Sequence, residues 1–208
     1  MQIQDTLKVS VLAMEFPGYG FFQYQIRDKA QKTKKLECNS KDIATNAKAV
    51  YSYVVSPPEE GGLGYKEENT VVYGRSMGTG PASLLAAENK PRGLILVSAY
   101  TTIREVAQSV TRKWIGWVVS EHFNNRKSMA MVRCPVLMIH GEKDPLIPVE
   151  HSRELFKIAS EQQSGTLGEW NVLKTPPNMT HNEFNFQFDL MQPTCRFYKS
   201  IFGLYKPS

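Results

Sequence analysis

A serine lies between two glycines in the segment Val71–Gly80, where the pattern is Gly74-x-Ser76-x-Gly78. At a sharp turn from a strand into a helix, a serine hydroxyl projects above the edge of a sheet and can attack a carbonyl carbon. Glycines are expected on both sides because side chains there would collide with the adjoining strand and helix. We therefore predict that Ser76 is a nucleophile; a glycine-rich structural turn is the alternative. The backbone N–H of Met77 would then face the developing oxyanion.

A serine hydroxyl is a weak nucleophile near neutral pH and needs a base beside it. The chain has four histidines. We predict that His181 is the base, because it lies in the polar loop 178–182 between the last expected strand and the closing helix. His122 and His151 lie in or beside expected helices and are expected at the surface. His140 ends a strand, where packing or loop hydrogen bonding is its expected role.

Such a base needs a carboxylate that holds it in the correct orientation. Asp144 lies in a proline-stiffened loop directly after the apolar run Pro135–Ile139. Glu142, in the same loop, is a rival by residue type, but Asp144 with the following Ile-Pro pair is the better candidate. The chain order of Ser76, Asp144 and His181 is the one expected when strands of one parallel sheet supply the three members.

The elements that would position these residues alternate along the chain. Short runs typical of strands occur at Val9–Met14, Val71–Tyr73, Gly93–Val97, Pro135–Ile139 and Trp170–Leu173. Helical patterns run from Asn39 or Ser40 to about Val55, and over Met77–Glu88, Ile103–Val110, Val149–Ser160 and Glu183–Phe202. Apolar strands separated by helices indicate a sheet covered on both faces. We predict an α/β fold with three α/β/α layers, a mostly parallel sheet and a single domain over residues 1–208.

Composition excludes several classes of protein. The chain has 208 residues, of which 41% are hydrophobic and 22% charged, so wholesale disorder is excluded. No apolar run approaches the ~20 residues that cross a bilayer. The net charge of +5 is spread along the chain apart from the run Lys29–Lys35. Since no aromatic residues are interleaved there, we expect a solvated loop and no nucleic-acid partner.

The three cysteines are Cys38, Cys134 and Cys195, which lie far apart in the chain. Their spacing fits neither a metal site nor a disulfide framework. We therefore expect a reducing, cytoplasmic setting and no metal ligands.

The nucleophile pattern belongs to a larger set of motifs. The set comprises Phe16–Gly20, Tyr73–Ala82, Val97–Ile103, Pro135–Pro148 and His181–Glu183. In order and spacing these motifs resemble the α/β-hydrolase superfamily, in its prolyl oligopeptidase/serine aminopeptidase-like group of serine hydrolases. Within that group the chain is similar to the Bem46-like and ABHD17/ABHD13-like branch. The resemblance extends from about residue 8 to residue 202.

The resemblance implies hydrolysis of an ester, thioester or amide through an acyl-enzyme, with no metal or organic cofactor. It implies a small-molecule or acylated-protein substrate, because several relatives act on palmitoylated cysteines. Relatives often carry a cysteine-rich lipid-anchoring segment that this chain does not show. We therefore expect no stable membrane insertion, and peripheral attachment at most. The oligomeric state is left open.

The amino end departs from the family pattern. Relatives begin with three further strands, and a His-Gly loop after the third completes the oxyanion hole. The only His-Gly pair here is His140-Gly141, in the loop of the acid. We expect an N-terminally truncated fold in which Lys8–Met14 shifts beside Val71–Tyr73 or leaves that edge exposed. The alternative function is then a catalytically impaired module that binds a ligand or partner.

A cap is expected in the connection Thr111–Cys134, which contains two tryptophans and several aliphatic residues. In this family the connection covers the serine, and apolar side chains there would shelter an acyl or aromatic group. The alternative is that these side chains pack on the sheet.

Overall fold

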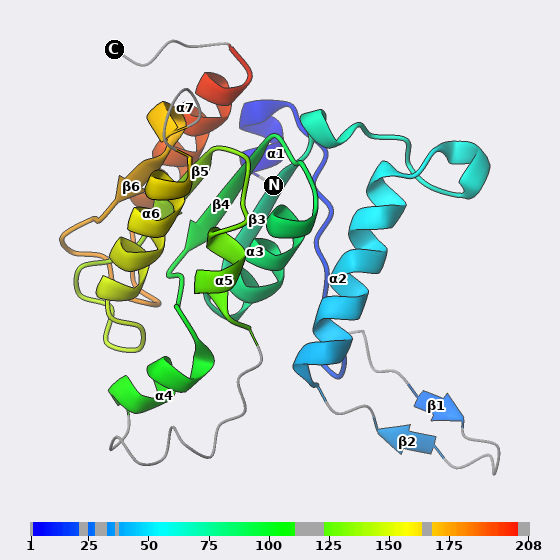
Figure 1. Cartoon of the computed structure of the whole chain (residues 1–208), viewed down its shortest axis with the longest axis horizontal. Coiled ribbons are helices and arrows are strands. Elements are labelled where there is room, and N and C mark those ends of the chain that lie inside the picture. Colours follow the sequence, from blue (N-terminus) through cyan, green and yellow to red (C-terminus); the bar gives the residue numbers. More distant parts are fainter. Residues whose placement is uncertain are drawn as a thin grey trace. The chain divides into compact units, whose positions relative to one another are not determined.

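The structure is a computed structural model that describes residues 2–20, 25–27, 33–35, 38–110, 123–163 and 168–203 (Figure 1). The chain forms two compact units, residues 1–64 and 65–208. The expected single domain over residues 1–208 stays a prediction, because two compact units can still belong to one domain.

The described part of the first unit holds two α-helices, a short hairpin and a 3₁₀ turn at Pro58–Glu60. The elements are α1 (Gln2–Leu7), β1 (Gln25–Arg27), β2 (Thr33–Lys35) and α2 (Ser40–Val55), with β1 and β2 antiparallel. Helix α2 begins where its capping residue predicts, since the Asn39 side chain accepts a hydrogen bond of 2.9 Å from Asp42 N. Its buried residues recur every four positions on one face, as the periodicity predicts: Ile43, Ala47 and Tyr51.

Two expectations for the first unit are wrong. Residues 9–16 form neither helix nor strand, so the strand expected at Val9–Met14 is absent. An apolar run becomes a strand only when a neighbouring backbone pairs with it, and no described segment pairs with this one. The expected loop Lys29–Lys35 ends in a strand instead, because Thr33–Lys35 pairs with Gln25–Arg27.

The second unit is built on a parallel sheet. Its strands are β3 (Val71–Arg75), β4 (Gly93–Val97), β5 (Val136–Ile139) and β6 (Val172–Lys174), hydrogen-bonded in that order. Because all four run in the same direction, their carboxyl ends lie along one edge of the sheet. The residues that directly follow each strand therefore lie at that edge.

Helices connect the strands (Figure 1). They are α3 (Thr79–Glu88), α4 (Ile103–Val110), α5 (Asn125–Met129), α6 (Glu150–Gln162) and α7 (Gln192–Ile201). Three short 3₁₀ turns at Glu67–Asn69, Ser76–Gly78 and Gly168–Trp170 and a π-helical turn at Phe186–Met191 complete the unit.

Alternating side chains of the central strands enter two separate apolar clusters. Leu94 and Leu96 of β4 pack with residues of α3 and α6, whereas Ile95 and Val97 pack with residues of α7. Strand β5 divides its side chains in the same way. Since both faces of the sheet are covered, the predicted three-layer α/β/α architecture with a mostly parallel sheet is confirmed.

Two expected elements differ in detail. The closing helix expected over Glu183–Phe202 is instead a π-helical turn followed by α7. Pro193 has no backbone N–H to donate to the carbonyl four residues earlier, so a regular α-helix running through it is disfavoured. The first half of the expected cap, residues 111–122, lies outside the described residues, and the described half contains α5.

Candidate active site

Ser76 lies at the junction of β3 and the 3₁₀ turn that leads into α3. Its φ angle of +51° is in the left-handed region, which costs a residue with a Cβ about 1–2 kcal/mol. The Thr79 hydroxyl donates a 2.7 Å hydrogen bond to the Ser76 carbonyl and ties the turn together. The local sequence predicts this strained strand–turn–helix geometry, which leaves the serine half-buried at the carboxyl edge of the sheet.

Of the two flanking glycines, Gly74 plays the expected role and Gly78 does not. A Cβ on Gly74 would lie 2.5 Å from the Gly78 carbonyl oxygen and 2.7 Å from Ala82 Cβ, so this glycine is required for close packing. A Cβ on Gly78 would meet nothing within 4 Å, so the expected collision there is wrong. The second required glycine is Gly80, where a Cβ would lie 2.6 Å from Phe123 Cγ.

This difference predicts opposite outcomes for two matched substitutions. Gly74→Ala should lower the free energy of unfolding by about 1–3 kcal/mol, the usual cost of overpacking a close contact. Gly78→Ala should leave that free energy unchanged within about 0.5 kcal/mol, as surface substitutions usually do. Urea unfolding of the two variants beside the parent chain measures both effects. Equal destabilisation by the two alanines would contradict the packing described here.

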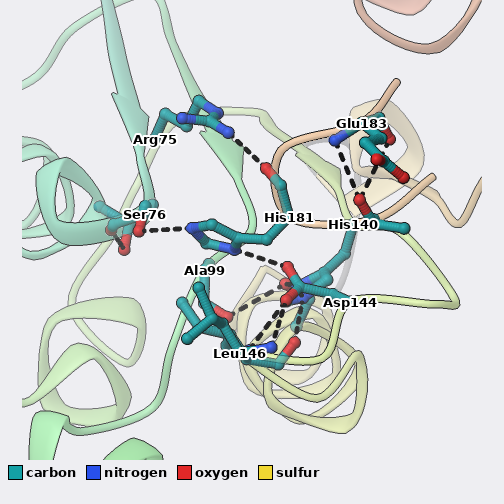
Figure 2. Close-up of polar contacts among 12 residues, drawn as sticks. Arg75, Ser76, Ala99, His140, Asp144, Leu146, His181 and Glu183 are labelled. Carbon is teal, nitrogen blue, oxygen red and sulfur yellow. Dashed lines mark hydrogen bonds and ion pairs between the residues drawn. The ribbon is translucent and has the colours of Figure 1, made fainter. Parts of the chain in front are cut away.

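His181 lies between Ser76 and Asp144 (Figure 2). Its Nε2 atom is 3.0 Å from Ser76 Oγ, and its Nδ1 atom is 2.8 Å from Asp144 Oδ2. The imidazole is nearly buried and the carboxylate fully buried. Because the carboxylate can only accept, Nδ1 carries a proton in this arrangement and Nε2 can receive one from the serine hydroxyl. The structure thus brings together the three side chains that the sequence predicts.

Backbone groups hold the Asp144 carboxylate in the loop after β5. Its Oδ1 atom accepts hydrogen bonds of 2.9 Å from both Leu146 N and Ile147 N. Burial acts to raise the pKa of Asp144, but hydrogen bonds from His140, Ile147 N, His181 and Leu146 N outweigh it and hold the pKa well below its usual range. The group is therefore an anion at neutral pH and faces His181 as a negative charge.

The rival acid does not join this arrangement. Glu142 forms an ion pair of 2.6 Å with Arg153 of α6 instead. Hydrogen bonds from Thr175 and Arg153 lower the pKa of Glu142 against a smaller opposing effect of burial. The two carboxylates of one loop are thus separated by their partners, and only Asp144 contacts an imidazole suited to be a base.

The two other described histidines, His140 and His151, are at least half-buried and lie outside the series that joins Ser76, His181 and Asp144. His140 is fully buried, with Nε2 3.5 Å from Asp144 Oδ2. His151 was expected at the surface but is half-buried, with Nδ1 2.6 Å from the Thr101 hydroxyl. Burial lowers the pKa of His151. His122 lies outside the described residues.

Arg75 contributes to the candidate active site in a way that local sequence patterns do not reveal. Its guanidinium donates a hydrogen bond to the backbone carbonyl of His181, 106 positions away in the sequence (Figure 2). The same guanidinium lies 5.5 Å from the ring centroid of Phe184, a cation–π distance. Arg75 therefore joins the strand before the nucleophile to the loop that carries the base. A basic residue beside the serine was the only available signal, and it does not specify this partner.

Met77 follows the nucleophile inside the 3₁₀ turn. The first N–H groups of a helical segment have no partner within that segment, so the Met77 N–H is a candidate oxyanion donor. Its role in binding an oxyanion stays a prediction. Within the described ranges, no three His, Cys, Asp or Glu side chains gather as metal ligands would.

Comparison with solved structures defines the fold. The chain resembles an esterase of Pyrococcus furiosus with a TM-score of 0.57 at 16% sequence identity, covering 81% of this chain and 65% of that chain. It resembles a puromycin-hydrolyzing peptidase of Mycobacterium tuberculosis with a TM-score of 0.57 at 12% identity, covering 79% and 25%. The chain therefore has the α/β-hydrolase fold, as the motifs indicate.

Sequence comparison gives named relatives. The chain is 34% identical over 112 residues to the lysophosphatidylserine lipase ABHD12 of Rattus norvegicus, covering 45% of this chain and 28% of the relative. It is 35% identical over 94 residues to α/β-hydrolase domain-containing protein 17B of Homo sapiens, covering 45% and 32%. The chain thus spans about a third of the length of these relatives. No family model matches it.

The described helices differ from a membrane-spanning helix. None of those within the described ranges combines the length and the apolar character that crossing a bilayer demands.

Proposed function

We propose that the chain is a serine hydrolase that cleaves an ester through Ser76, His181 and Asp144. The observation that carries the proposal is the unbroken hydrogen-bonded series from Ser76 Oγ through the His181 imidazole to the Asp144 carboxylate. The similarity to ABHD12, named as a lipase, and to solved esterases supports an ester as the substrate class.

The steps follow from the acceptors and donors. Ser76 Oγ attacks the ester carbonyl carbon while His181 Nε2 takes the hydroxyl proton. The tetrahedral oxyanion then collapses, the bond to the leaving oxygen breaks, and His181 returns the proton to that oxygen. Water next attacks the acyl-serine ester, again losing a proton to His181, and the released serine regains it. Asp144 stabilises the imidazolium at both stages without taking its proton, and the Met77 N–H supports the oxyanion.

Within this substrate class, the proposed substrate is a thioester or an ester with an apolar acyl group. Met77 and Leu146, each near a member of the proposed triad in sequence, expose 49% and 42% of their surface. Apolar side chains at such positions would contact an acyl chain. The proposal includes two kinds of substrate, an acyl-protein thioester and a small-molecule ester. It also includes a cytoplasmic setting peripheral to membranes, and it involves no cofactor and no nucleic-acid partner.

Covalent labelling tests the proposal directly. A fluorophosphonate reacts with an activated serine and leaves a stable adduct whose mass is found in the peptide that contains Ser76. We expect one adduct per folded chain, mapped to Ser76, and slower labelling when an acyl ester or thioester competes. Folded protein that forms no adduct would overturn the proposal and favour a module that binds without catalysis.

A further inference from the structure

The Asp144 carboxylate contacts two imidazoles rather than one. Its Oδ2 atom lies 2.8 Å from His181 Nδ1 and 3.5 Å from His140 Nε2. The proposed triad uses only the first of these contacts. His140 and Asp144 have no exposed side-chain surface, so the second contact is shielded from bulk solvent.

The partners of His140 define which of its nitrogens carries the proton. Nε2 lies 2.8 Å from the carbonyl oxygen of Ile147, which can only accept, so Nε2 is the donor. Nδ1 lies 2.6 Å from the hydroxyl of Ser152 in α6, which then donates to it. The Nε2 hydrogen is therefore donated to the Ile147 carbonyl, and the Asp144 carboxylate lies 3.5 Å from the same nitrogen.

These contacts hold the acid loop at both ends of a short turn. The Asp144 carboxylate accepts from Ile147 N through Oδ1, and His140 binds the Ile147 carbonyl. A rotation of the carboxylate away from His181 would have to break the bonds at Oδ1 and also remove Oδ2 from the His140 donor. His140 in turn cannot rotate freely, because Ser152 occupies its other nitrogen.

We propose that His140 is a positioning residue for the proposed triad, which holds the Asp144 carboxylate turned toward His181 through the Nε2 side of its ring while Ser152 restrains the rotation of that ring. This inference rests on the proposed function. Burial acts to raise the pKa of Asp144, and the hydrogen bond from His140 is one of those that outweigh burial and lower this pKa. Other ionisable groups that act near this cluster are Arg75 on β3, Glu142 in the acid loop and His151 on α6.

The first test compares two substitutions at His140. His140→Leu removes both nitrogens, whereas His140→Gln places an amide donor near the position of Nε2. For labelling by a fluorophosphonate, we expect the inactivation rate constant of His140→Leu to fall about 10- to 100-fold, as misplacing a catalytic group does. The probe's binding constant should stay unchanged, and His140→Gln should recover most of the rate. Met138→Leu, a buried volume-conserving change on β5, is the matched control and should keep the parent rate.

The second test does not depend on turnover. The hydrogen between His181 Nδ1 and Asp144 Oδ2 gives a proton resonance far downfield when the two groups are held together. We expect this resonance in the parent chain, its loss or displacement in His140→Leu, and its return in His140→Gln. Because it reports only alignment, it tests the positioning role even if labelling of the parent chain fails and the hydrolase proposal falls.

Ser152→Ala keeps the inference testable if His140→Leu does not fold. Without the Ser152 hydroxyl, the His140 ring loses the contact that restrains its rotation, so we expect a smaller fall in the inactivation rate constant and a displaced resonance. Unchanged rate and resonance in the folded variants, or equal losses in His140→Leu and His140→Gln, would overturn the positioning role.

Discussion

Replacing Ser76 with alanine is expected to lower the hydrolysis rate of an activated ester by about 10⁶-fold, the scale reported for loss of a serine nucleophile. The reason is chemical, because alanine offers no oxygen that can form an acyl-enzyme. The fold should persist, since alanine occupies the same positive φ angle of Ser76 at a similar strain. Steady-state hydrolysis of a p-nitrophenyl ester measures the effect.

Ser98 provides a matched control for this substitution. It also has a φ angle of +51°, directly follows β4, and is fully buried. Ser98→Ala should therefore perturb the backbone in a comparable way while leaving the hydrolysis rate within about threefold of the parent rate, a change worth less than 1 kcal/mol. A Ser76→Ala protein that keeps a tenth of the parent rate would show that another group is the nucleophile.

A double variant tests whether Ser76 and His181 act as a unit. Ser76→Ala combined with His181→Ala should cost about as much as either change alone, because a base has no function without the hydroxyl it activates. Costs that multiply would contradict the hydrogen-bonded series of Ser76 and His181.

Asp144→Asn is the second large effect, and we expect the hydrolysis rate to fall about 10⁴-fold. The carboxylate accepts from His181 Nδ1 and so keeps Nε2 free to receive the serine proton. An asparagine amide can donate instead, which favours the wrong tautomer of the imidazole. Glu142→Gln is the control in the same loop, and its rate should stay near that of the parent because Glu142 pairs with Arg153. Similar losses in both variants would contradict the assignment of the acid.

The same variant also tests the charge of Asp144 through stability. Burial opposes ionisation, but the hydrogen bonds described above lower the pKa of Asp144 in the folded chain. Its ionisation therefore stabilises the fold fully above the unfolded pKa of about 3.9, and the stabilisation declines as the pH falls below that value. The difference in free energy of unfolding between the parent chain and Asp144→Asn should shrink from pH 6 to pH 3. A difference that is constant with pH would contradict a lowered pKa.

Local sequence patterns were sufficient for much of the fold. The bounds predicted for β4 and α4 match those observed, and one of the two residues at which α2 was expected to begin, Asn39, is its N-cap. These elements depend on hydrophobic periodicity, turn residues and caps, all of which act within a few residues. The strand expected at Val9–Met14 was wrong because strand formation depends on a pairing partner that no local pattern specifies.

The candidate site, like the fold, has features that the local sequence predicts and features that depend on distant parts of the chain. The sequence by itself determined the strained turn at Ser76, the acid loop after β5 and the polar loop of His181, because each is a short motif that follows a strand or precedes a helix. Only the tertiary structure decided that Gly80 and not Gly78 must lack a side chain, that Arg75 binds the His181 carbonyl, and that His140 shares the Asp144 carboxylate. The first two of these facts join elements far apart in sequence, and the third depends on how one loop folds against α6. Such contacts arise from packing, which the identity of neighbouring residues in the chain does not encode.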